Sequence, residues 1–384
     1  MQPEGFRTGE SQHPTETEPA AQAGEGSAHT RAPHAESVRV PQGRGPRGPA
    51  VSTLVQQRPA SDPEPLTDPR EPRRPRPRRR PRGVLTALLA AVLAVGLAGH
   101  WWLPDDYGLG SFVESFLPWF GAPILLLALA SLVRRSLLAA VATLLPVVVW
   151  AAMFGPELLP RQAGGPYDVR VVSQNMLDGN RDVTASATAL KDANADVVAV
   201  QELTSAAYRT TSRVLGESYP HRWRVGTLAV WSRFPALDEP RSVDIGIGWV
   251  RAFRIDLRAP TGRVRLYNVH LASLTVGQGG FESGARDRTL RRLARAVAAD
   301  ASPRVVLVGD LNTAATDRSF QMLTRQLTSA QDEAGGDFGF TWPARFPMAR
   351  IDHVLSRGLR AVRSGVLPAT GSDHRPVVAE LRLD

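Results

Sequence analysis

Residues 304–312 read RVVLVGDLN, a stretch that combines a buried strand with a polar turn. Residues 305–308 are apolar and mostly β-branched, which is typical of a short strand covered on both faces. Gly309 lets the backbone turn, so that Asp310 and Asn312 emerge where the strand ends. A strand followed by Gly-Asp is common and can be a turn without function. Similar strand ends elsewhere in the chain therefore decide what the stretch indicates.

Other apolar runs of strand length also carry polar side chains at or near one end. In chain order these are Asn175 in VVSQNM (171–176), Glu202 in VVAVQEL (197–203), Asn268 and His270 in LYNVHL (266–271), Asp352 in RIDHVL (350–355), and Asp373 and His374 in GSDHRPVVAEL (371–381). Amphipathic helical patterns lie between these runs, at 182–193, 205–215, 284–299 and 317–327. The alternation of strand and helix patterns predicts an α/β fold.

In this order the motifs resemble those of the endonuclease/exonuclease/phosphatase family. Its members are metal-dependent phosphohydrolases similar to DNase I, exonuclease III, neutral sphingomyelinase and inositol polyphosphate 5-phosphatases. The resemblance covers residues 167–384, about 218 of 384 residues, and GDLN and SDHRPV are its most specific pieces. It implies a four-layer α/β sandwich, DNase I-like, in which two packed sheets are flanked by helices and the active site lies at one edge of the sheets.

The resemblance also implies a metal site. Glu202 would bind the ion, and Asn175 would sit beside it, on the metal or on the phosphate. Asp373 would bind or shape the same site. Hydrolysis of a phosphate ester needs a cation on the phosphoryl oxygens, and oxygen ligands suit Mg²⁺, or Mn²⁺ in its place. The alternative for Glu202 is that it only caps the helix that follows.

The remaining site residues receive catalytic roles by the same resemblance. Asp310 would orient or deprotonate the attacking water, and Asn312 would hydrogen-bond the phosphate. His374 would face the phosphorus and bind the phosphate in its anionic transition state, with its imidazole held by Asp352. A carboxylate beside an imidazole favours the charged imidazolium that such a transition state requires. His270 matches a family histidine that can protonate the leaving group.

Two further residues are expected to support the site, and a third is interpreted as structural. GTLAVWSRFP (226–235) is similar to a family segment in which a strand ends in Ser-Arg, so Ser232 and Arg233 are expected to buttress the active site. His353 stands where the family usually has an aromatic residue, and we interpret it as structural.

Charge and cysteine content bound the partners. Residues 161–384 hold 30 Lys and Arg against 23 Asp and Glu. The surplus favours an anionic partner such as nucleic acid or acidic lipid headgroups, although arginine enrichment through coding bias explains it equally well. The chain has no cysteine, which excludes disulfides and thiolate metal sites. Four arginines near the helix predicted at 284–299 are interpreted as a solvated face, with contact to a polyanionic substrate as the alternative. They are Arg286, Arg288, Arg291 and Arg292.

Residues 1–82 are predicted to form a disordered, Pro- and Arg-rich cytoplasmic tail. They are rich in Pro, Gly, Ser and Glu and lack hydrophobic periodicity, so they cannot bury enough apolar surface to fold. The tail ends in REPRRPRPRRRPR (70–82), which contains eight arginines. We interpret this run as a topology signal before a membrane span, with binding to anionic lipid or nucleic acid as the alternative.

Three apolar stretches follow, at about 83–103, 116–133 and 136–154, and each is predicted to cross a membrane. A cleaved signal peptide does not fit the first stretch, because 82 residues precede it. Placing both arginine clusters in the cytoplasm leaves the enzyme domain on the outer face. The second and third stretches could instead form a buried helical hairpin. Residues 155–166 are a linker, and residues 167–384 form the catalytic domain.

These observations predict a multi-pass protein of the cell membrane with an extracytoplasmic catalytic domain. Its expected activity is Mg²⁺-dependent cleavage of phosphodiester bonds by metal-assisted in-line attack of water. Nucleic acid is the expected substrate, and a lipid headgroup, cleaved by a sphingomyelinase-like or phosphoinositide phosphatase-like activity, is the alternative. A non-catalytic binding module would be expected to have lost some of the site residues, which are all present. The protein is expected to be monomeric.

Overall fold

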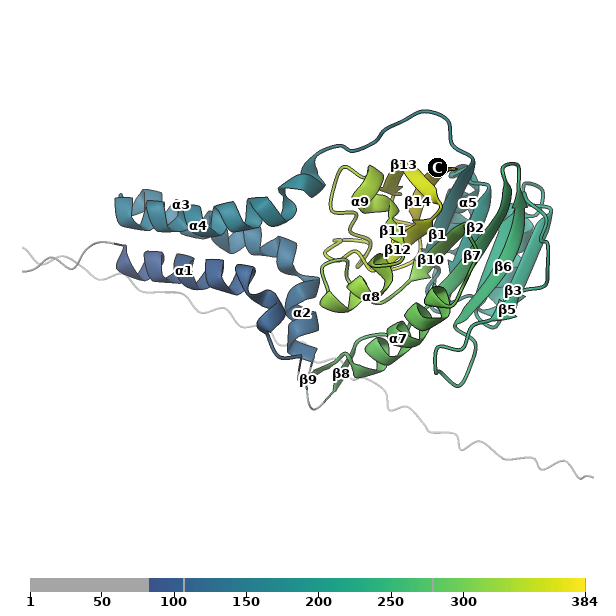
Figure 1. Ribbon diagram of the computed structural model, residues 1–384, viewed down its shortest axis with the longest axis horizontal. Coiled ribbons are helices and arrows are strands. Elements are labelled where there is room, and N and C mark those ends of the chain that lie inside the picture. The colour runs from purple at the N-terminus through teal and green to yellow at the C-terminus, as the bar shows by residue number, and fades with distance from the viewer. Residues whose placement is uncertain (1–82, 106–107, 278–279, 384) are drawn as a thin grey trace, which may run out of the picture. The chain divides into compact units, whose positions relative to one another are not determined.

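The computed structural model describes residues 83–105, 108–277 and 280–383 (Figure 1). The predicted tail, residues 1–82, lies outside the described residues. All the helices and strands described belong to one unit, Arg76–Asp384.

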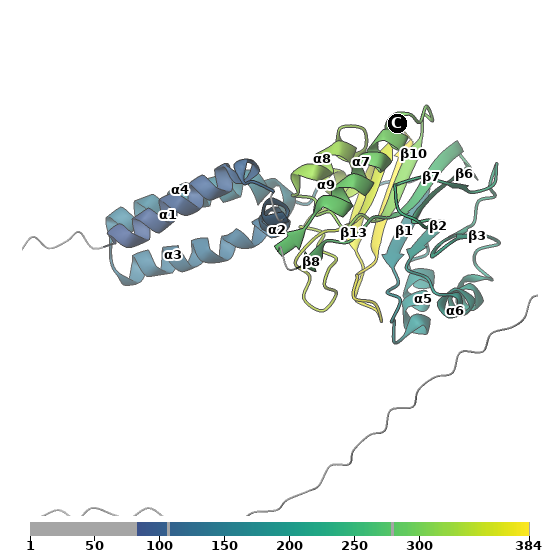
Figure 2. The ribbon, with the colours of Figure 1, turned by 90° about the horizontal axis from the view of Figure 1, so that it is seen from below.

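Two six-stranded mixed sheets form the catalytic domain (Figures 1 and 2). The strands of the first sheet are β1 (Val169–Asn175), β2 (Val197–Gln201), β3 (His221–Val225), β4 (Leu228–Ser232), β13 (Leu359–Val366) and β14 (Val377–Leu383). The strands of the second are β5 (Arg241–Ser242), β6 (Ala252–Ala259), β7 (Gly262–His270), β10 (Val305–Asp310), β11 (Thr328–Ser329) and β12 (Asp352–Arg357). Their orders are β13-β14-β1-β2-β4-β3 and β11-β12-β10-β7-β6-β5, and β8 (Thr275–Gly277) pairs separately with β9 (Gly280–Glu282).

Helices cover the outer face of each sheet. The helices of the catalytic domain are α5 (Val183–Asp192), α6 (Ser205–Leu215), α7 (Gly284–Ala298), α8 (Gln321–Thr324) and α9 (Ala330–Ala334). Figure 2 shows α5 and α6 on one side of the two sheets and α7 and α8 on the other. Asp182 caps α5 by accepting a hydrogen bond from Ala185 N, and Thr204 caps α6 in the same way through Ala207 N.

Alternating side chains give the central strands two apolar faces. Val306 and Val308 of β10 belong to the core between the sheets, whereas Val305 and Leu307 pack in the layer that contains Leu290 of α7. Strands β1 and β2 divide their side chains in the same way, between the central core and the layer of α5 and α6. This order of helix, sheet, sheet and helix is the four-layer α/β sandwich that the family resemblance implies.

One predicted helix is shorter in the structure. The pattern at 317–327 becomes a 3₁₀ turn at Arg318–Phe320 followed by the four residues of α8. Asp317 accepts a hydrogen bond from Ser319 N and so starts the turn. The helix ends early because Thr328 and Ser329 join the second sheet as β11.

Within the described residues, four helices precede the domain. They are α1 (Val84–Ala98), α2 (Leu109–Ser115), α3 (Gly121–Val133) and α4 (Leu137–Phe154). Short 3₁₀ helices at His100–Trp102, Leu117–Phe120 and Gly155–Leu158 connect or extend them. Within the described residues, the helix Leu137–Leu158 is long and apolar enough to cross a membrane, and Leu109–Ser115 with Leu117–Val133 forms a second such segment that bends by 69°. The helix α1 is apolar but shorter than the length required.

Candidate active site

Strand pairing brings the predicted site residues to one edge of the sandwich. In the first sheet β1 and β2 are parallel, and the pairing of Asn175 with Gln201 places Glu202 next to Asn175. In the second sheet Asp310 pairs with His270 of the parallel strand β7 and with Asp352 of the antiparallel strand β12. Paired residues point to the same face of a sheet, so His270, Asp310 and Asp352 form a row.

Gly309 permits the exit of β10 beside β7. Its φ angle is 137°, and a Cβ atom there would lie 1.9 Å from the carbonyl oxygen of Val269. A side chain at this position would therefore collide with backbone. Two non-glycine residues beside the site, Glu202 and Asn312, also have positive φ angles, of 55° and 46°. Strained backbone of this kind is common at functional sites.

Asn175 connects the two sheets at the centre of the site. Its Nδ2 donates hydrogen bonds to Glu202 Oε1 at 3.0 Å and to Asp310 Oδ2 at 2.9 Å. Its Oδ1 accepts from the backbone N–H of Leu177 at 3.0 Å. The amide therefore holds two carboxylates close together, which is favourable only with compensating positive charge nearby.

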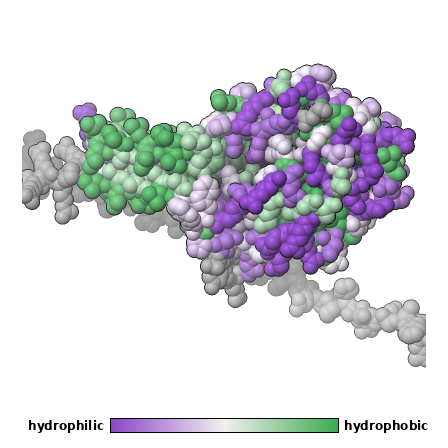
Figure 3. All heavy atoms as spheres, in the orientation of Figure 1, coloured by the Kyte–Doolittle hydropathy of each residue, from purple (hydrophilic) through white to green (hydrophobic). Residues whose placement is uncertain are grey.

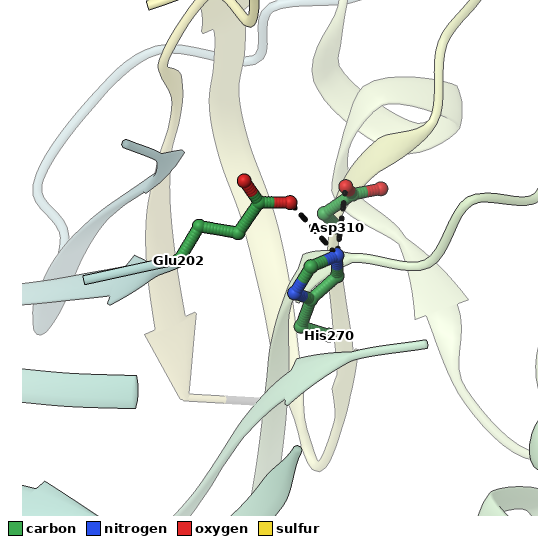
Figure 4. Close-up of side chains that lie close together, drawn as sticks. All are labelled: Glu202, His270 and Asp310. Carbon is green, nitrogen blue, oxygen red and sulfur yellow. Dashed lines mark ion pairs between the residues drawn. The ribbon is translucent and has the colours of Figure 1, made fainter. Parts of the chain in front are cut away.

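His270 lies between the same two carboxylates (Figure 4). Its Nε2 is 3.3 Å from Glu202 Oε1 and 3.5 Å from Asp310 Oδ2. Arg251 contacts both ring nitrogens, with Nη2 2.6 Å from Nδ1. Burial, with the charge of Arg251, lowers the pKa of His270 to about 4, although Asp310 opposes the shift. The imidazole is therefore neutral near pH 7. The role of His270 as the proton donor to the leaving group stays a prediction.

His374 has the opposite electrostatic environment. Its Nδ1 is hydrogen-bonded to Asp352 Oδ2 at 2.8 Å, and its Nε2 faces Asp310 Oδ2 at 3.8 Å. Burial alone would lower the pKa of His374, but Asp352 and Asp310 outweigh it and raise the pKa to about 10. The ring is therefore an imidazolium at neutral pH. The structure brings Asp352, Asp310 and His374 together as the sequence motifs predict.

Asp310 itself is fully buried. Burial raises the pKa of its carboxyl group above the ordinary value, and the charge of Asp352 adds to the effect. Asn312 fixes the carboxylate, because its backbone N–H donates to Oδ1 at 2.8 Å and its Nδ2 lies 3.3 Å from Oδ2. The same Nδ2 is 3.1 Å from the carbonyl oxygen of Leu271. Asn312 thus orients Asp310 in the structure.

Asp373 is placed less closely than the other predicted metal ligands. Its Oδ1 lies 4.0 Å from His374 Nε2, and it lines the same pocket as Glu202. Among the described residues, two clusters of acids and histidines are compact enough to hold a metal ion, and neither contains Asp373. One cluster is Glu202, His270 and Asp310, and the other is Asp310, Asp352 and His374.

Ser232 and Arg233 are not part of the site, contrary to the sequence-based expectation. Ser232 pairs with Val197, the first residue of β2, whereas Glu202 follows the last residue of that strand. The antiparallel direction of β4 thus carries its end to the opposite edge of the sheet. Arg233 instead forms a salt bridge with Asp196 at 3.4 Å.

His353 and Arg286 show how packing decides the role of a polar side chain. His353 is buried, its ring lies against Phe320, and its Nε2 is hydrogen-bonded to the carbonyl oxygen of Thr313 at 2.9 Å. This is the structural position expected for it. Arg286 is fully buried and bonded to Asp317 at 2.6 Å, so its assignment to a solvated helix face was wrong.

Two pockets meet the cluster. One, of about 240 Å³, is lined by Asp178, Glu202, Thr204, Thr227, Trp249, Arg251 and His270. The other, of about 340 Å³, is lined by Phe112, Ser115, Phe116, Glu202, Ser273, Leu274, Asp310, Asn312, Trp342, Ala349, Ile351, Asp373 and His374. Arg251, Phe112 and Phe116 were not predicted as site residues, because no local sequence pattern connects them with the motifs.

The donor set fits a hard divalent cation. The ligand atoms of Glu202, His270 and Asp310 lie within 4.8 Å of one another. Asp352 Oδ1 and Asp373 Oδ1 are buried oxygen atoms without a hydrogen-bond partner among the described residues. Several carboxylate oxygens around one pocket, with an amide beside them, match the oxygen ligands that Mg²⁺ and Mn²⁺ prefer.

Comparison with known proteins agrees with this geometry. The profile of the endonuclease/exonuclease/phosphatase family matches residues 172–374. None of the curated proteins compared with the chain matches it.

Solved structures similar to the chain include the following three. An endonuclease/exonuclease/phosphatase from Beutenbergia cavernae shares 19% identity over 57% of this chain and 72% of that chain, with a TM-score of 0.44. Humanized TDP2 of D. rerio shares 17% over 56% and 98%, with a TM-score of 0.48. A mannosyl-6-phosphatase of Bacteroides thetaiotaomicron shares 18% over 56% and 99%, with a TM-score of 0.46.

The family match spans more than half of the chain, from β1 to His374, and includes every residue of both clusters. The members of that family are metal-dependent hydrolases of phosphate esters. This chain belongs to the endonuclease/exonuclease/phosphatase family and is an enzyme that hydrolyses phosphate ester bonds with a divalent metal.

Proposed function

We propose that this chain is a membrane-anchored, Mg²⁺-dependent phosphodiesterase whose catalytic domain lies outside the cytoplasm. The observation that carries the proposal is the cluster of Glu202, His270 and Asp310, whose ligand atoms lie within 4.8 Å of one another. Apolar helices precede this cluster in the same chain. The steps below assign a part in the hydrolysis to each residue of the site.

Glu202 and Asn175 would hold the cation, with Asp373 on the wall of the same pocket. When bound, the ion supplies positive charge to the phosphoryl oxygens and to the crowded carboxylates. Magnesium suits the site because it accepts one or two carboxylates and keeps its remaining positions for water and phosphate oxygens.

Asp310 is the proposed base for the attacking water. A carboxyl group whose pKa is raised by burial is a stronger base than an exposed one. Hydrogen bonds from Asn175 and Asn312 fix both of its oxygens, so the direction in which it accepts a proton is set before the substrate binds. Such orientation is a main source of catalysis in phosphoryl transfer.

His374 and Arg251 are the side chains proposed to supply positive charge at the site. His374 lies beside Asp310, and Arg251 lines the same pocket as Glu202. The pKa of His374, raised to about 10, keeps a proton on the ring that can be donated to a phosphoryl oxygen. Arg251 lines the pocket next to Glu202 and His270, where it can stabilise the leaving oxygen. In this assignment the neutral His270 orients Arg251 and the carboxylates and does not act as a proton donor.

Exposed apolar side chains support the membrane anchor. Examples on α1, α3 and α4 are Leu85, Leu125 and Leu137, which are 64%, 72% and 79% exposed. On the face shown in Figure 3, hydrophobic residues (green) cover most of the surface of these helices. A bilayer would cover this surface, and α4 has the length that a span requires. We propose that all three apolar stretches lie in the membrane, with α1 and α3 extended by their neighbouring 3₁₀ turns.

The pocket linings weaken the expectation of a nucleic-acid substrate. Among the described residues that line the two pockets, Arg251 is the single arginine or lysine. Binding a nucleic acid requires contacts with several phosphates, which lysine and arginine usually provide. A phosphodiester with one phosphate at the reaction centre fits the linings better.

The test uses the full chain in detergent with Mg²⁺ and four substrates: supercoiled DNA, short single strands, sphingomyelin and phosphoinositides. The control is Asp310→Asn, which keeps the volume of the side chain but removes the base. We expect hydrolysis of at least one phosphoester, and a rate in the variant lower by about a hundredfold to ten-thousandfold. Equal rates for the two proteins, or no Mg²⁺-dependent hydrolysis, would contradict the proposed function.

A further inference from the structure

The larger pocket beside Asp310 has an apolar side. Phe112, Phe116, Leu274 and Ile351 line it together with the charged residues of the site, and the pocket has a volume of about 340 Å³. A substrate that was polar throughout would leave this side in contact with water. An apolar wall next to a phosphoester site indicates a substrate with an apolar group close to its phosphate.

Part of this wall comes from outside the catalytic domain predicted from the sequence. Phe112 and Ser115 belong to α2, between the first two predicted membrane spans, and Phe116 follows α2 as the first residue of the second predicted span. Phe116 precedes the first residue of α3 by five positions. Five residues of chain reach at most about 18 Å, so the wall cannot lie far from the start of an apolar helix.

A buried ionic contact holds the wall against the domain. The side chain of Glu114, two residues from both phenylalanines, is fully buried. Its Oε1 accepts from Arg318 Nε at 2.9 Å, and its Oε2 accepts from the backbone N–H of Arg318 at 2.8 Å. The remaining Arg318 nitrogens donate to the carbonyl oxygens of His100, Trp101 and Leu103.

Two more contacts fix the same segment. Arg286 donates from Nη2 to Ser111 Oγ at 2.9 Å, and Trp119 donates from Nε1 to the carbonyl oxygen of Met348 at 2.9 Å. Ser111 and Trp119 lie on either side of the two phenylalanines in the sequence. The segment that forms the wall is therefore held against the domain by contacts with Arg318, Arg286 and Met348.

We propose that this pocket binds the hydrocarbon chain of a membrane lipid and that the enzyme hydrolyses the phosphodiester of the same lipid. The apolar lining is formed by Phe112, Phe116, Leu274 and Ile351. The proposal rests on the proposed function, because it takes Asp310 and His374 as the reaction centre. A lipid is the occupant because the segment that forms the wall is joined directly to apolar helices whose exposed faces a bilayer would cover. The helices would thus present lipid to the site as well as anchor the enzyme.

The experiment compares two synthetic substrates with the same reacting bond, methyl p-nitrophenyl phosphate and hexadecyl p-nitrophenyl phosphate. The full chain is assayed in detergent with Mg²⁺, and kcat/KM is measured for each ester. We expect the hexadecyl ester to be preferred by at least about tenfold, because burial of several methylene groups stabilises its complex. Phe112→Ala should reduce this preference about tenfold, and Phe112→Leu, which remains apolar, should restore most of it.

Leu237→Ala provides the matched control. Leu237 is 40% exposed and Phe112 37%, but Leu237 does not line either pocket. The control should keep the wild-type preference. Equal kcat/KM for the two esters in the wild type, or equal loss of preference in Phe112→Ala and Leu237→Ala, would overturn the inference while leaving the proposed function intact. Failure to hydrolyse either ester, with DNA and natural lipids also uncut, would instead overturn the proposed function.

Discussion

His374 keeps its proton because carboxylates face its ring from two elements, β12 and β10. Asp352 Oδ2 is 2.8 Å from Nδ1, and Asp310 Oδ2 is 3.8 Å from Nε2. His270 Nε2 lies 3.5 Å from the same Asp310 oxygen, yet the pKa of His270 shifts in the opposite direction, to about 4 rather than about 10. Burial lowers the pKa of both rings. At His270 the charge of Arg251 adds to this effect, whereas at His374 the charges of Asp352 and Asp310 outweigh it. Two histidines of one site therefore carry different charges.

The first prediction concerns pH. A raised pKa means that the imidazolium of His374 persists until the pH approaches about 10, so its charge is not lost between pH 7 and pH 9. In Asp352→Asn the pKa should fall toward the ordinary value of about 6.5. The variant should then lose kcat/KM progressively above about pH 7, whereas the wild type should not. Parallel pH profiles for the two proteins would contradict the assignment.

At the residue scale, the sequence motifs predicted which residues gather at the site better than they predicted the charge states of those residues. The side chains at the strand ends, including Asp310, Asp352 and His374, do converge in the structure. The charge state of His270 could not be predicted, because it depends on burial and on contact with Arg251. Arg251 lies 19 residues away in the sequence and belongs to none of the motifs. The burial of Arg286 was also missed, since its partner Asp317 lies 31 residues away.

At the level of elements, strand pairing explains most of the site. Parallel strands β1 and β2, and β7 and β10, end at the same edge of the sandwich, and this follows from runs such as VVAVQ and VVLVGD. The misplacement of Ser232 and Arg233 has the same origin. The sequence of β4 is apolar, like that of the other strands. Its direction relative to β2 is set by strand pairing, which the sequence of a single strand does not reveal.

A second prediction concerns the acid stability of the second sheet. Asp300, at the end of α7, accepts hydrogen bonds from Arg265 at 2.7 Å and from Ser302 N at 2.8 Å. Burial raises the pKa of Asp300, but hydrogen bonds from Tyr267 and Ser302 outweigh it and lower the pKa to about 2. The carboxylate therefore stabilises the fold above about pH 4, and this contribution is lost as the pH falls through about 2.

Asp300→Asn should accordingly lower the free energy of unfolding by about 2 kcal/mol at pH 7. The difference between the two proteins should shrink as the pH falls from about 4 to about 2. Thermal unfolding of the full chain in detergent measures this difference in the free energy of unfolding. The control is Asp192→Asn, because Asp192 is exposed. A difference that stays constant over this range would rule out the electrostatic origin.

The third prediction tests the contact that holds the pocket wall. Removing one partner of a buried ion pair leaves the other charge without compensation, so Glu114→Ala should lower stability by about 3 kcal/mol. The double variant Glu114→Ala with Arg318→Ala should lose less than the sum of the single variants. Glu217→Ala, at an exposed site, should change little. Additive losses at Glu114 and Arg318 would show that the two residues are not coupled.

At the scale of the whole molecule, the apolar segments and the catalytic domain are less separate than the sequence suggests. Composition places a boundary at the linker 155–166, since a Pro- and Gly-containing stretch divides two kinds of sequence. Yet residues 100–119 contact the domain through Arg318, Arg286 and Met348. These contacts span more than 170 residues of sequence, so no local pattern could predict them. The apolar pattern also does not show the 3₁₀ turns at His100 and Leu117, which lie within the first two stretches.

The fourth prediction concerns topology, which follows from the arginine clusters in the sequence. A reporter enzyme that is active only outside the cytoplasm, fused after Asp384, should be active in cells that express the full chain. The matched fusion after Arg135, between the second and third stretches, should be inactive. Activity of the second fusion alone would invert the proposed orientation.

The most direct test of the central claim is the Mg²⁺ dependence of hydrolysis by the full chain and by Glu202→Gln. Bound metal is removed from both proteins with EDTA. The rate of cleavage of hexadecyl p-nitrophenyl phosphate is then measured as Mg²⁺ is added back. The wild-type rate should rise from zero to a plateau, and the variant should require at least about tenfold more Mg²⁺, because it lacks a carboxylate ligand. Activity that persists in EDTA, or identical Mg²⁺ curves for the two proteins, would contradict the assignment of this cluster as a metal-dependent phosphoesterase site.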